Sequence, residues 1–202
     1  MNEKKDQISS EQALEVIKSM IENSRQKQRY AGFYHLLWGV LISLAIGTMY
    51  LLLKAENYSM IGFSWAGYSI VGAILSITHS KKNYINEGSK NYPDIGIGAI
   101  WISLMVAMVL VCFVFPYMGA YGWEVIYIMV CLLLGIGNLV TGLILKEKLP
   151  IINGILWWLG SIALLFMNGY FSYMALFVGL LFINNILPGT YMLVQERKNH
   201  GK

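Results

Sequence analysis

The residues of this chain that could do chemistry are hydrogen-bonding side chains set within long uncharged stretches. The strongest candidates are His35, Asn138, Asn153, Asn184 and Asn185. Polar groups are costly in apolar surroundings, so such residues mark either a ligand pocket or hydrogen bonds between helices. No acidic or basic side chain lies deep in any of these stretches, which argues against charge-coupled transport.

Pro188 and Gly189 interrupt the last uncharged stretch. Proline has no amide hydrogen, so Pro188 leaves the carbonyl oxygen of Asn184 without its usual partner four residues later. We expect a helix kink at Pro188 and Gly189. The adjacent amides Asn184 and Asn185 either satisfy the broken turn or point into a cavity.

Catalytic patterns find little support in the sequence. Ser64 and His79 could suggest an intramembrane serine and histidine pair, but the intervening helix would separate them by about 22 Å. Metalloprotease, dinucleotide-binding, P-loop and paired-carboxylate motifs do not occur. His35, His79 and His200 could gather on one side, but no thiolate or carboxylate obviously joins them around a metal. We therefore predict no enzymatic activity, no cofactor and no metal site.

The composition indicates a membrane protein. Of 202 residues, 56% are hydrophobic and 13% are charged, whereas soluble chains carry roughly 25% charged residues. A soluble enzyme, a nucleic-acid-binding domain and a disulfide-stapled secreted module each need a polar surface that this chain lacks. The charges also concentrate before residue 30, so residues 1–29 form an aqueous segment.

Six apolar stretches are long enough to cross a bilayer as helices, which requires about 20 apolar residues, and the one formal charge inside them is Glu124 at an edge. They are Tyr30 to Leu53, Met60 to His79, Ile95 to Phe115, Trp123 to Leu145, Leu149 to Met167 and Phe171 to Val194. A β-barrel would alternate polar and apolar residues, and these stretches do not. The sequence predicts an all-α, polytopic membrane helix bundle with six transmembrane helices arranged as three hairpins.

The orientation follows from the positions of lysine and arginine. These residues gather in the N-terminal segment, the second and fourth loops and the C-terminus, and the other three connections hold only Lys54. Positive charge near a span is retained in the cytosol. Both termini are therefore expected in the cytosol, and a bacterial cytoplasmic (inner) membrane is the expected location of this multi-pass protein.

The first 29 residues predict a cytosolic amphipathic helix from Ser10 to Arg29. Apolar residues recur at helical spacing, acids lie early and bases lie late, as the helix dipole favours. The basic residues Arg25, Lys27 and Arg29 are candidates for contact with anionic lipid. The helix could also dock on a partner protein or on its own bundle. The expected domains are 1–29, the transmembrane domain 30–194 and a basic tail 195–202.

The three predicted hairpins share a weak repeat. Each odd span has a tryptophan near its start, and each even span has a glycine shortly before the basic cluster. The tryptophans are Trp38, Trp101 and Trp157, and the glycines are Gly72, Gly142 and Gly189. Small residues also recur every fourth position in most spans, which is typical of helices that pack within one bundle or form a homo-oligomer.

The segment FYHLLWG at residues 33–39, together with the closing Pro188 and Gly189 before a basic tail, resembles a group of small uncharacterised bacterial six-helix membrane proteins. The resemblance implies no activity, ligand or catalytic residue. We expect a non-enzymatic integral membrane protein of regulatory, accessory or scaffolding type. It would lie in the lipid bilayer, contact a cytosolic or membrane protein through residues 1–29 and bind no nucleic acid. The alternative is a small transporter or ligand-binding protein with a cytosol-facing polar pocket.

Overall fold

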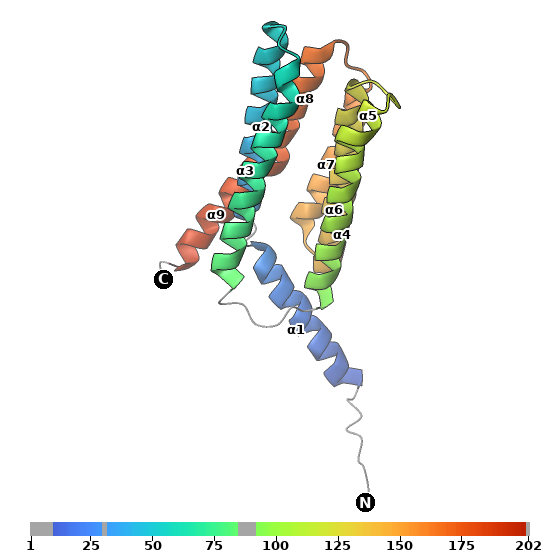
Figure 1. The fold of residues 1–202 in the computed structure, drawn as a ribbon. Coiled ribbons are helices and arrows are strands. Elements are labelled where there is room, and N and C mark those ends of the chain that lie inside the picture. The colour runs from blue at the N-terminus through green and yellow to red at the C-terminus, as the bar shows by residue number, and fades with distance from the viewer. Residues whose placement is uncertain (1–9, 30–31, 85–91, 201–202) are drawn as a thin grey trace, which may run out of the picture.

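The computed structural model describes residues 10–29, 32–84 and 92–200, with side chains described for 12–23, 32–79, 81, 92–195 and 198. Throughout these described ranges every regular element is helical (Figure 1), which confirms the expected all-α class. The elements are α1 (Ser10–Arg29), α2 (Gly32–Lys54), α3 (Ser59–Tyr84), α4 (Tyr92–Val109), η1 (Leu110–Val114), α5 (Phe115–Tyr117), α6 (Glu124–Leu145), α7 (Lys148–Leu164), α8 (Tyr170–Leu181), η2 (Phe182–Ile186) and α9 (Leu187–His200). The labels η1 and η2 denote π-helical turns that join α4 to α5 and α8 to α9 into continuous helices.

Five helical segments in the described part of the chain are long and apolar enough to cross a membrane. They are Gly32–Lys54, Ser59–His79, Tyr92–Tyr117, Glu124–Leu145 and Tyr170–Gln195. The remaining apolar helix, α7, has 17 residues, which corresponds to about 25 Å against a bilayer core of roughly 30 Å. The fold supports a membrane-embedded bundle, and the sixth crossing stays a prediction.

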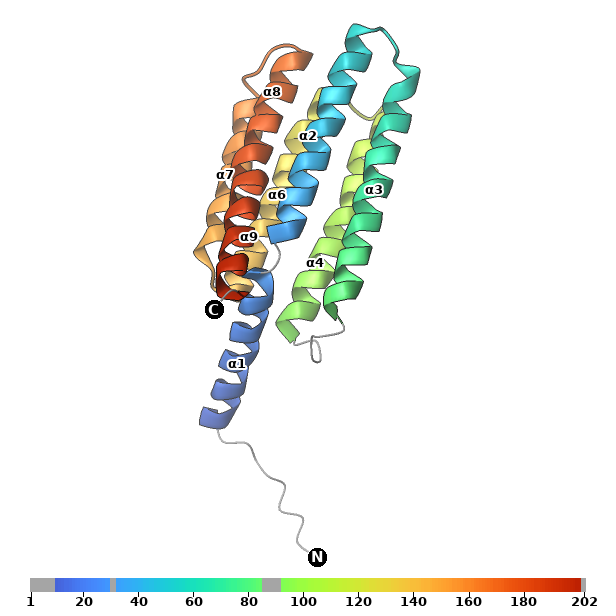
Figure 2. The same ribbon diagram turned by 90° about the vertical axis from the view of Figure 1, so that its left-hand side faces the viewer.

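The helices form two layers. Figure 2 shows α8 with α9, then α2, then α3 in the front layer, and α7, α6 and α4 behind them. In the front layer α2 contacts both α9 and α3, while α6 contacts both α7 and α4 in the other. The layers meet through α8, which packs against α6 and α7. The buried core lies at this junction and includes Ile46, Cys131, Trp157, Phe177 and Leu181.

Glycine lets α6 and α7 approach closely. A Cβ atom on Gly154 would lie 2.8 Å from the backbone nitrogen of Leu139 and 2.9 Å from the carbonyl oxygen of Gly135. The two helices are joined by a tight turn in which Lys146 adopts a left-handed conformation with φ of 54°. Its amide donates to the carbonyl oxygens of Gly142 and Leu143, which caps the end of α6.

The third long helix extends beyond its predicted end. We expected the span to stop at Phe115 with Pro116 in the following loop, but the helix continues through Tyr117. The π-helical turn η1 makes this continuation feasible, because the amide of Phe115 donates to the carbonyl oxygen of Leu110, five residues back. Pro116 is thus carried inside a helix and is buried.

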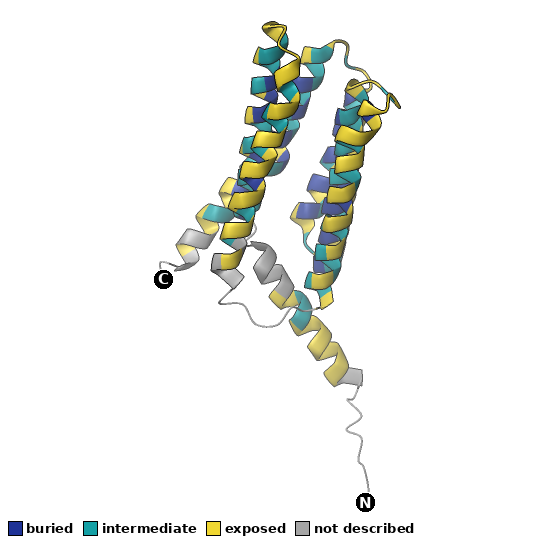
Figure 3. Cartoon of the chain, viewed as in Figure 1, coloured by how far each residue is buried: buried dark blue, intermediate teal, exposed yellow. Residues whose placement is uncertain are grey.

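The first helix, α1, has the bounds that the sequence predicts. It lies at the same end of the molecule as the end of α9 and contacts the adjoining ends of α4 and α6 (Figure 1). Its described side chains are mostly exposed (Figure 3), including the apolar residues Leu14, Val16 and Ile17. α1 is therefore attached to the bundle mainly at one part of its length.

Candidate functional site

The structure distributes the five predicted polar residues over four elements. Asn138 lies on α6, Asn153 on α7, Asn184 and Asn185 on η2, and His35 on α2. Asn138, Asn153 and Asn184 are buried, whereas His35 and Asn185 are partly exposed. They make two separate pairings between helices, and Asn138 makes its described bond within its own helix.

The first pairing joins α7 to the helix interrupted by Pro188. The Nδ2 group of Asn153 donates to the backbone carbonyl oxygen of Asn184 at 3.1 Å. This is the carbonyl that loses its amide partner to proline. The π-helical turn η2 precedes Pro188, with the amide of Leu187 donating to the carbonyl oxygen of Phe182. Figure 1 shows that α9 leaves the direction of α8 at this point. The broken turn is therefore satisfied by a side chain from a neighbouring helix.

Asn184 itself retains one unused acceptor. Its Nδ2 group donates to the carbonyl oxygen of Leu180 at 3.1 Å, one turn earlier in the same helix. Its side chain is 0% exposed, and its Oδ1 atom has no hydrogen-bond partner among the described residues. An unpaired buried acceptor costs free energy. The buried Oδ1 atom of Asn184 could therefore accept from a small hydrogen-bond donor.

The second pairing links η2 to α2. The Nδ1 atom of His35 lies 3.5 Å from Oδ1 of Asn185, with the donor role depending on the histidine tautomer. At the same crossing, a Cβ atom on Gly189 would lie 2.7 Å from the amide nitrogen of Leu36 and 2.9 Å from the carbonyl oxygen of Gly32. Gly189 thus allows α9 to touch the backbone of α2, which is a packing role.

Asn138 differs from the other asparagines. Its Nδ2 group donates to the carbonyl oxygen of Leu134 at 2.9 Å, four residues earlier in α6. The contact between α6 and α4 is instead made by Trp101, whose Nε1 group donates to Oγ1 of Thr141 at 3.1 Å. The bond of Trp101 joins two helices, whereas the bond of Asn138 lies within α6.

The interhelical bonds that the sequence reasoning missed include two between α7 and α6. Ser161 donates to the carbonyl oxygen of Ile128 at 3.2 Å, and Nε1 of Trp158 donates to the carbonyl oxygen of Leu132 at 3.2 Å. Both residues lie on α7 and both acceptors lie on α6. Ser161 follows Asn153 by about two helical turns, and that spacing could have placed them on one face.

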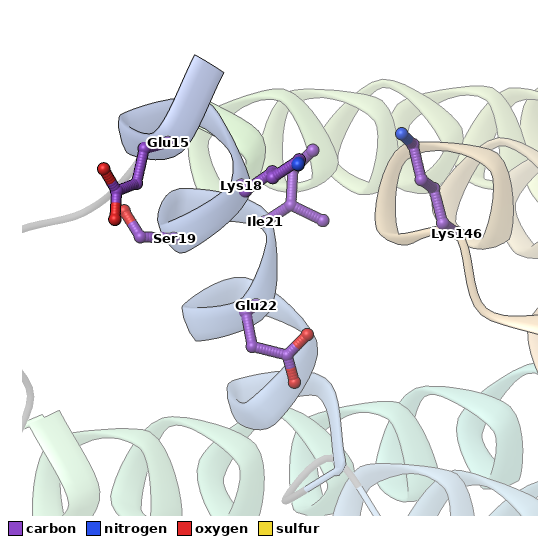
Figure 4. A pocket seen from close by; sticks show the side chains of 6 residues that line it. All are labelled: Glu15, Lys18, Ser19, Ile21, Glu22 and Lys146. Atoms are coloured by element: carbon purple, nitrogen blue, oxygen red, sulfur yellow. The ribbon is translucent and has the colours of Figure 1, made fainter. Parts of the chain in front are cut away.

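A cavity of about 470 Å³ lies elsewhere, between α1 and the turn that follows α6. Figure 4 shows the α1 side chains on one side and Lys146 on the other. The lining residues are Glu15, Lys18, Ser19, Ile21, Glu22 and Lys146. Acidic and basic side chains alternate there, so the cavity has no single charge, and none of the five predicted polar residues lines it.

Three residues predicted to contact lipid, Arg25, Lys27 and Arg29, belong to α1, but only their backbone lies within the described part of the chain. Among the described residues, no group of three or more histidine, cysteine, aspartate or glutamate side chains could hold a metal ion. Cys112 and Cys131 are free thiols.

Comparison of the chain with known protein families, curated proteins and solved structures finds no match. The functional argument therefore depends on the residues and their geometry.

Proposed function

We propose that this protein is a non-enzymatic integral membrane protein of accessory, regulatory or scaffolding type that acts through a protein partner bound to α1. In this proposal six helices cross a bacterial inner membrane and both termini lie in the cytosol. The excess of lysine and arginine at the end that carries α1 supports that orientation. α1 would then be the part of the molecule best placed to meet a cytosolic protein.

The exposed apolar face of α1 is the observation that carries this proposal. Leu14 is 52% exposed and Ile17 is 53% exposed, and the two are three residues apart, so they share one face of the helix. In proteins most of the stability of a helix comes from packing of its amphipathic face against other elements. Covering this face would stabilise α1, and an amphipathic helix laid into an apolar groove is a common mode of protein recognition.

The direction of α1 favours a protein over the lipid surface. A helix that lies on a membrane runs parallel to the bilayer plane and buries its apolar face at the headgroup boundary. Figure 1 instead shows α1 running obliquely away from the end of the bundle. The N-terminal part of the apolar face is thereby carried away from the membrane-facing helices.

The pairing of the buried amides also favours an accessory role. Asn153 donates to a backbone carbonyl oxygen of η2 and so joins two helices, and Asn138 donates to a carbonyl oxygen of its own helix, so both Nδ2 groups are used within the structure. The alternative, a small ligand-binding protein or transporter, is supported by the unpaired Oδ1 atom of Asn184. Asn184→Ala would abolish ligand binding in that alternative and would leave partner binding by α1 unchanged.

The proposal is tested by site-specific photo-crosslinking of the full chain in its native membrane. With the crosslinker at position 17, we expect one protein adduct of discrete mass, and we expect it to disappear when Leu14→Glu is added. Asn23 is exposed and lies about 120° around the helix from Ile17 and about 180° from Leu14, so position 23 is the matched control. Lipid adducts alone, or equal protein adducts at positions 17 and 23, would contradict the proposal.

A further inference from the structure

The cavity between α1 and the turn after α6 brings together charges from separate elements. Lys18 and Glu22 lie on α1, and Lys146 lies in the turn between α6 and α7. Figure 4 shows Lys18 and Glu22 directed toward the side on which Lys146 lies. The carboxylate of Glu15 points in the opposite direction. Two ammonium groups and one carboxylate therefore face the same space, which is here named the α1 cavity.

Lys146 occupies a backbone position that suits glycine. Its φ of 54° is left-handed, and helix ends of this kind are usually closed by glycine or asparagine. The amide of residue 146 would cap α6 with any side chain that tolerates this conformation. Lys148 supplies another positive charge in the same connection. A lysine at position 146 thus indicates a role for its side chain, which extends toward α1 in Figure 4.

The α1 cavity lies at the depth of lipid headgroups. Glu124–Leu145 is long and apolar enough to cross a membrane, and Lys146 is the residue that follows it. The headgroup layer extends about 5 to 7 Å beyond the hydrocarbon core on each side, which a lysine side chain can reach. Leu143, three residues before Lys146, is exposed and provides an apolar surface for an acyl chain on the membrane side of the cavity.

The charges of the α1 cavity match a zwitterion better than a simple anion or cation. Ammonium groups on two sides of a space attract a phosphate group, for which lysine is a common ligand. The carboxylate of Glu22 repels a second negative charge and attracts an ammonium group. A phosphate and a primary ammonium joined by two carbons provide both charges in one small group, and the cavity volume of about 470 Å³ is sufficient for it.

We infer that the α1 cavity binds the phosphoethanolamine headgroup of a membrane lipid. Lys18 and Lys146 donate to the phosphate oxygens from two sides, and Glu22 accepts from the ammonium group. The lipid thereby bridges α1 and the end of α6, two elements that are already in contact. Leu14 and Ile17 are not among the residues that line the cavity, so the site does not depend on the partner proposed for their face.

Native mass spectrometry of the full chain in mild detergent tests this site. The protein is mixed with equal amounts of phosphatidylethanolamine, phosphatidylglycerol and phosphatidylcholine with identical acyl chains, and the added mass identifies the bound lipid. We expect phosphatidylethanolamine to be retained about tenfold over the other two. Phosphatidylglycerol lacks the ammonium group, and the quaternary ammonium of phosphatidylcholine has no hydrogen to donate to Glu22. Equal retention of the three lipids, or a preference for phosphatidylglycerol, would overturn the inference.

A matched pair of substitutions in the turn tests the phosphate contact. Lys146→Gly suits the left-handed backbone, so we expect the fold to be kept and retention of phosphatidylethanolamine to fall by about tenfold. Lys148→Gln removes a charge from the same connection, outside the residues that line the cavity, and should have no effect. Lys18→Gln, at an exposed position of α1, should reproduce the loss without altering the turn. Equal falls for Lys146→Gly and Lys148→Gln, or no fall for Lys18→Gln, would contradict the site.

Two carboxylate substitutions on α1 test the ammonium contact. Glu22→Gln should bring the ratio of bound phosphatidylethanolamine to bound phosphatidylcholine close to one, because an amide does not attract the ammonium group as a carboxylate does. Glu15→Gln should leave this ratio unchanged, because its carboxylate points away from Lys146. An unchanged ratio in Glu22→Gln would show that this residue does not bind the headgroup.

Free phosphoethanolamine distinguishes a lipid from a soluble ligand with the same chemistry. We expect it to bind the delipidated protein far more weakly than phosphatidylethanolamine does, because it has no acyl chain to lie against Leu143. Binding of the free compound as tight as that of the lipid, and lost in Lys146→Gly, would overturn the assignment to a membrane lipid.

Discussion

The side chain of Asn153 supplies the hydrogen-bond donor that the backbone of the last helix lacks at Pro188. Pro188 cannot donate to the carbonyl oxygen of Asn184, and Nδ2 of Asn153 does so from α7 at 3.1 Å. The bond is made between two buried residues, where an unpaired carbonyl would be costly. Interhelical bonds of this kind are worth about 0.6 kcal/mol on average and about 1.7 kcal/mol at most.

This pairing predicts a specific coupling between Asn153 and Pro188. Asn153→Ala should lower the free energy of unfolding by about 0.5 to 1.5 kcal/mol, because it leaves the Asn184 carbonyl unpaired. In a chain that already carries Pro188→Ala, residue 188 has an amide, and Asn153→Ala should cost much less. Reversible unfolding in mixed micelles measures the four variants of this double-mutant cycle.

Asn138→Ala is the control for the cycle, because Asn138 donates within its own helix. It should show no coupling to Pro188→Ala. Equal costs of Asn153→Ala with and without Pro188 would show that the bond does not serve the broken turn.

The sequence was sufficient to identify the carbonyl oxygen of Asn184 as an acceptor without a partner, but it did not identify Asn153 as the donor. Pro188 alone implies an unpaired carbonyl at Asn184, since proline chemistry is local. The donor, Asn153, is 31 residues away along the chain. Which asparagine reaches that carbonyl depends on the rotation and depth of α7 against η2. Spacing within one helix does not contain that information.

The two long helices that carry a proline beyond their first turn, Pro116 and Pro188, share a feature. η1 ends two residues before Pro116, and η2 ends two residues before Pro188. A π-helical turn adds one residue to the turn, and such turns are found where helices bend. The lengths of the apolar stretches predicted which parts of the sequence form these helices, because about 20 residues are needed to cross a bilayer. The end of the third was misplaced, because Pro116 was interpreted as a helix stop rather than as the second case of the Pro188 pattern.

Close contact between α6 and α7 predicts a strong dependence on glycine. Gly154→Ala would place a Cβ atom 2.8 Å from the nitrogen of Leu139 and 2.9 Å from the oxygen of Gly135, and both are backbone atoms. The helices would have to separate, at a cost of about 1 to 3 kcal/mol. Thermal unfolding of the purified protein in detergent should show a clear fall in Tm.

Gly179→Ala on α8 is the matched substitution. Its Cβ atom would meet nothing within 4 Å, so it should leave the Tm unchanged or raise it, because alanine is the better helix former by about 1 kcal/mol. If both alanine variants unfolded at the same temperature, the close approach of α6 and α7 would not limit stability.

Across the whole molecule, the connections between layers are less predictable than the helices. Helices that a short loop connects are expected to be neighbours, and α6 with α7 is such a pair. The contact between α2 and α9 joins the two ends of the chain, and it depends on Gly32 meeting Gly189. The sequence contains 20 glycines. Nothing in their spacing identifies Gly32 and Gly189 as the two that face each other, because that pairing is determined by how the helices pack.

The sixth crossing is the prediction on which the topology depends. With 17 residues, α7 spans about 25 Å, somewhat less than the bilayer core. It is nevertheless among the most buried helices, with Trp157 and Leu164 both 0% exposed. Neighbouring helices, rather than its own length, can hold its ends at the correct depth, because a modest mismatch costs only fractions of a kcal/mol per Å.

Cysteine labelling in intact cells decides whether α7 crosses. In a chain lacking Cys112 and Cys131, we expect an impermeant maleimide to label Asn57→Cys and Asn168→Cys, because their loops lie at the far end of the bundle from α1. Glu147→Cys, in the turn before α7, should be labelled only after the membrane is opened. Asn57 lies before α7 in the chain, so its labelling does not depend on that helix. If Asn168→Cys behaved like Glu147→Cys, α7 would not cross, α8 would begin on the cytosolic side, and the common location of the two termini would be lost with it.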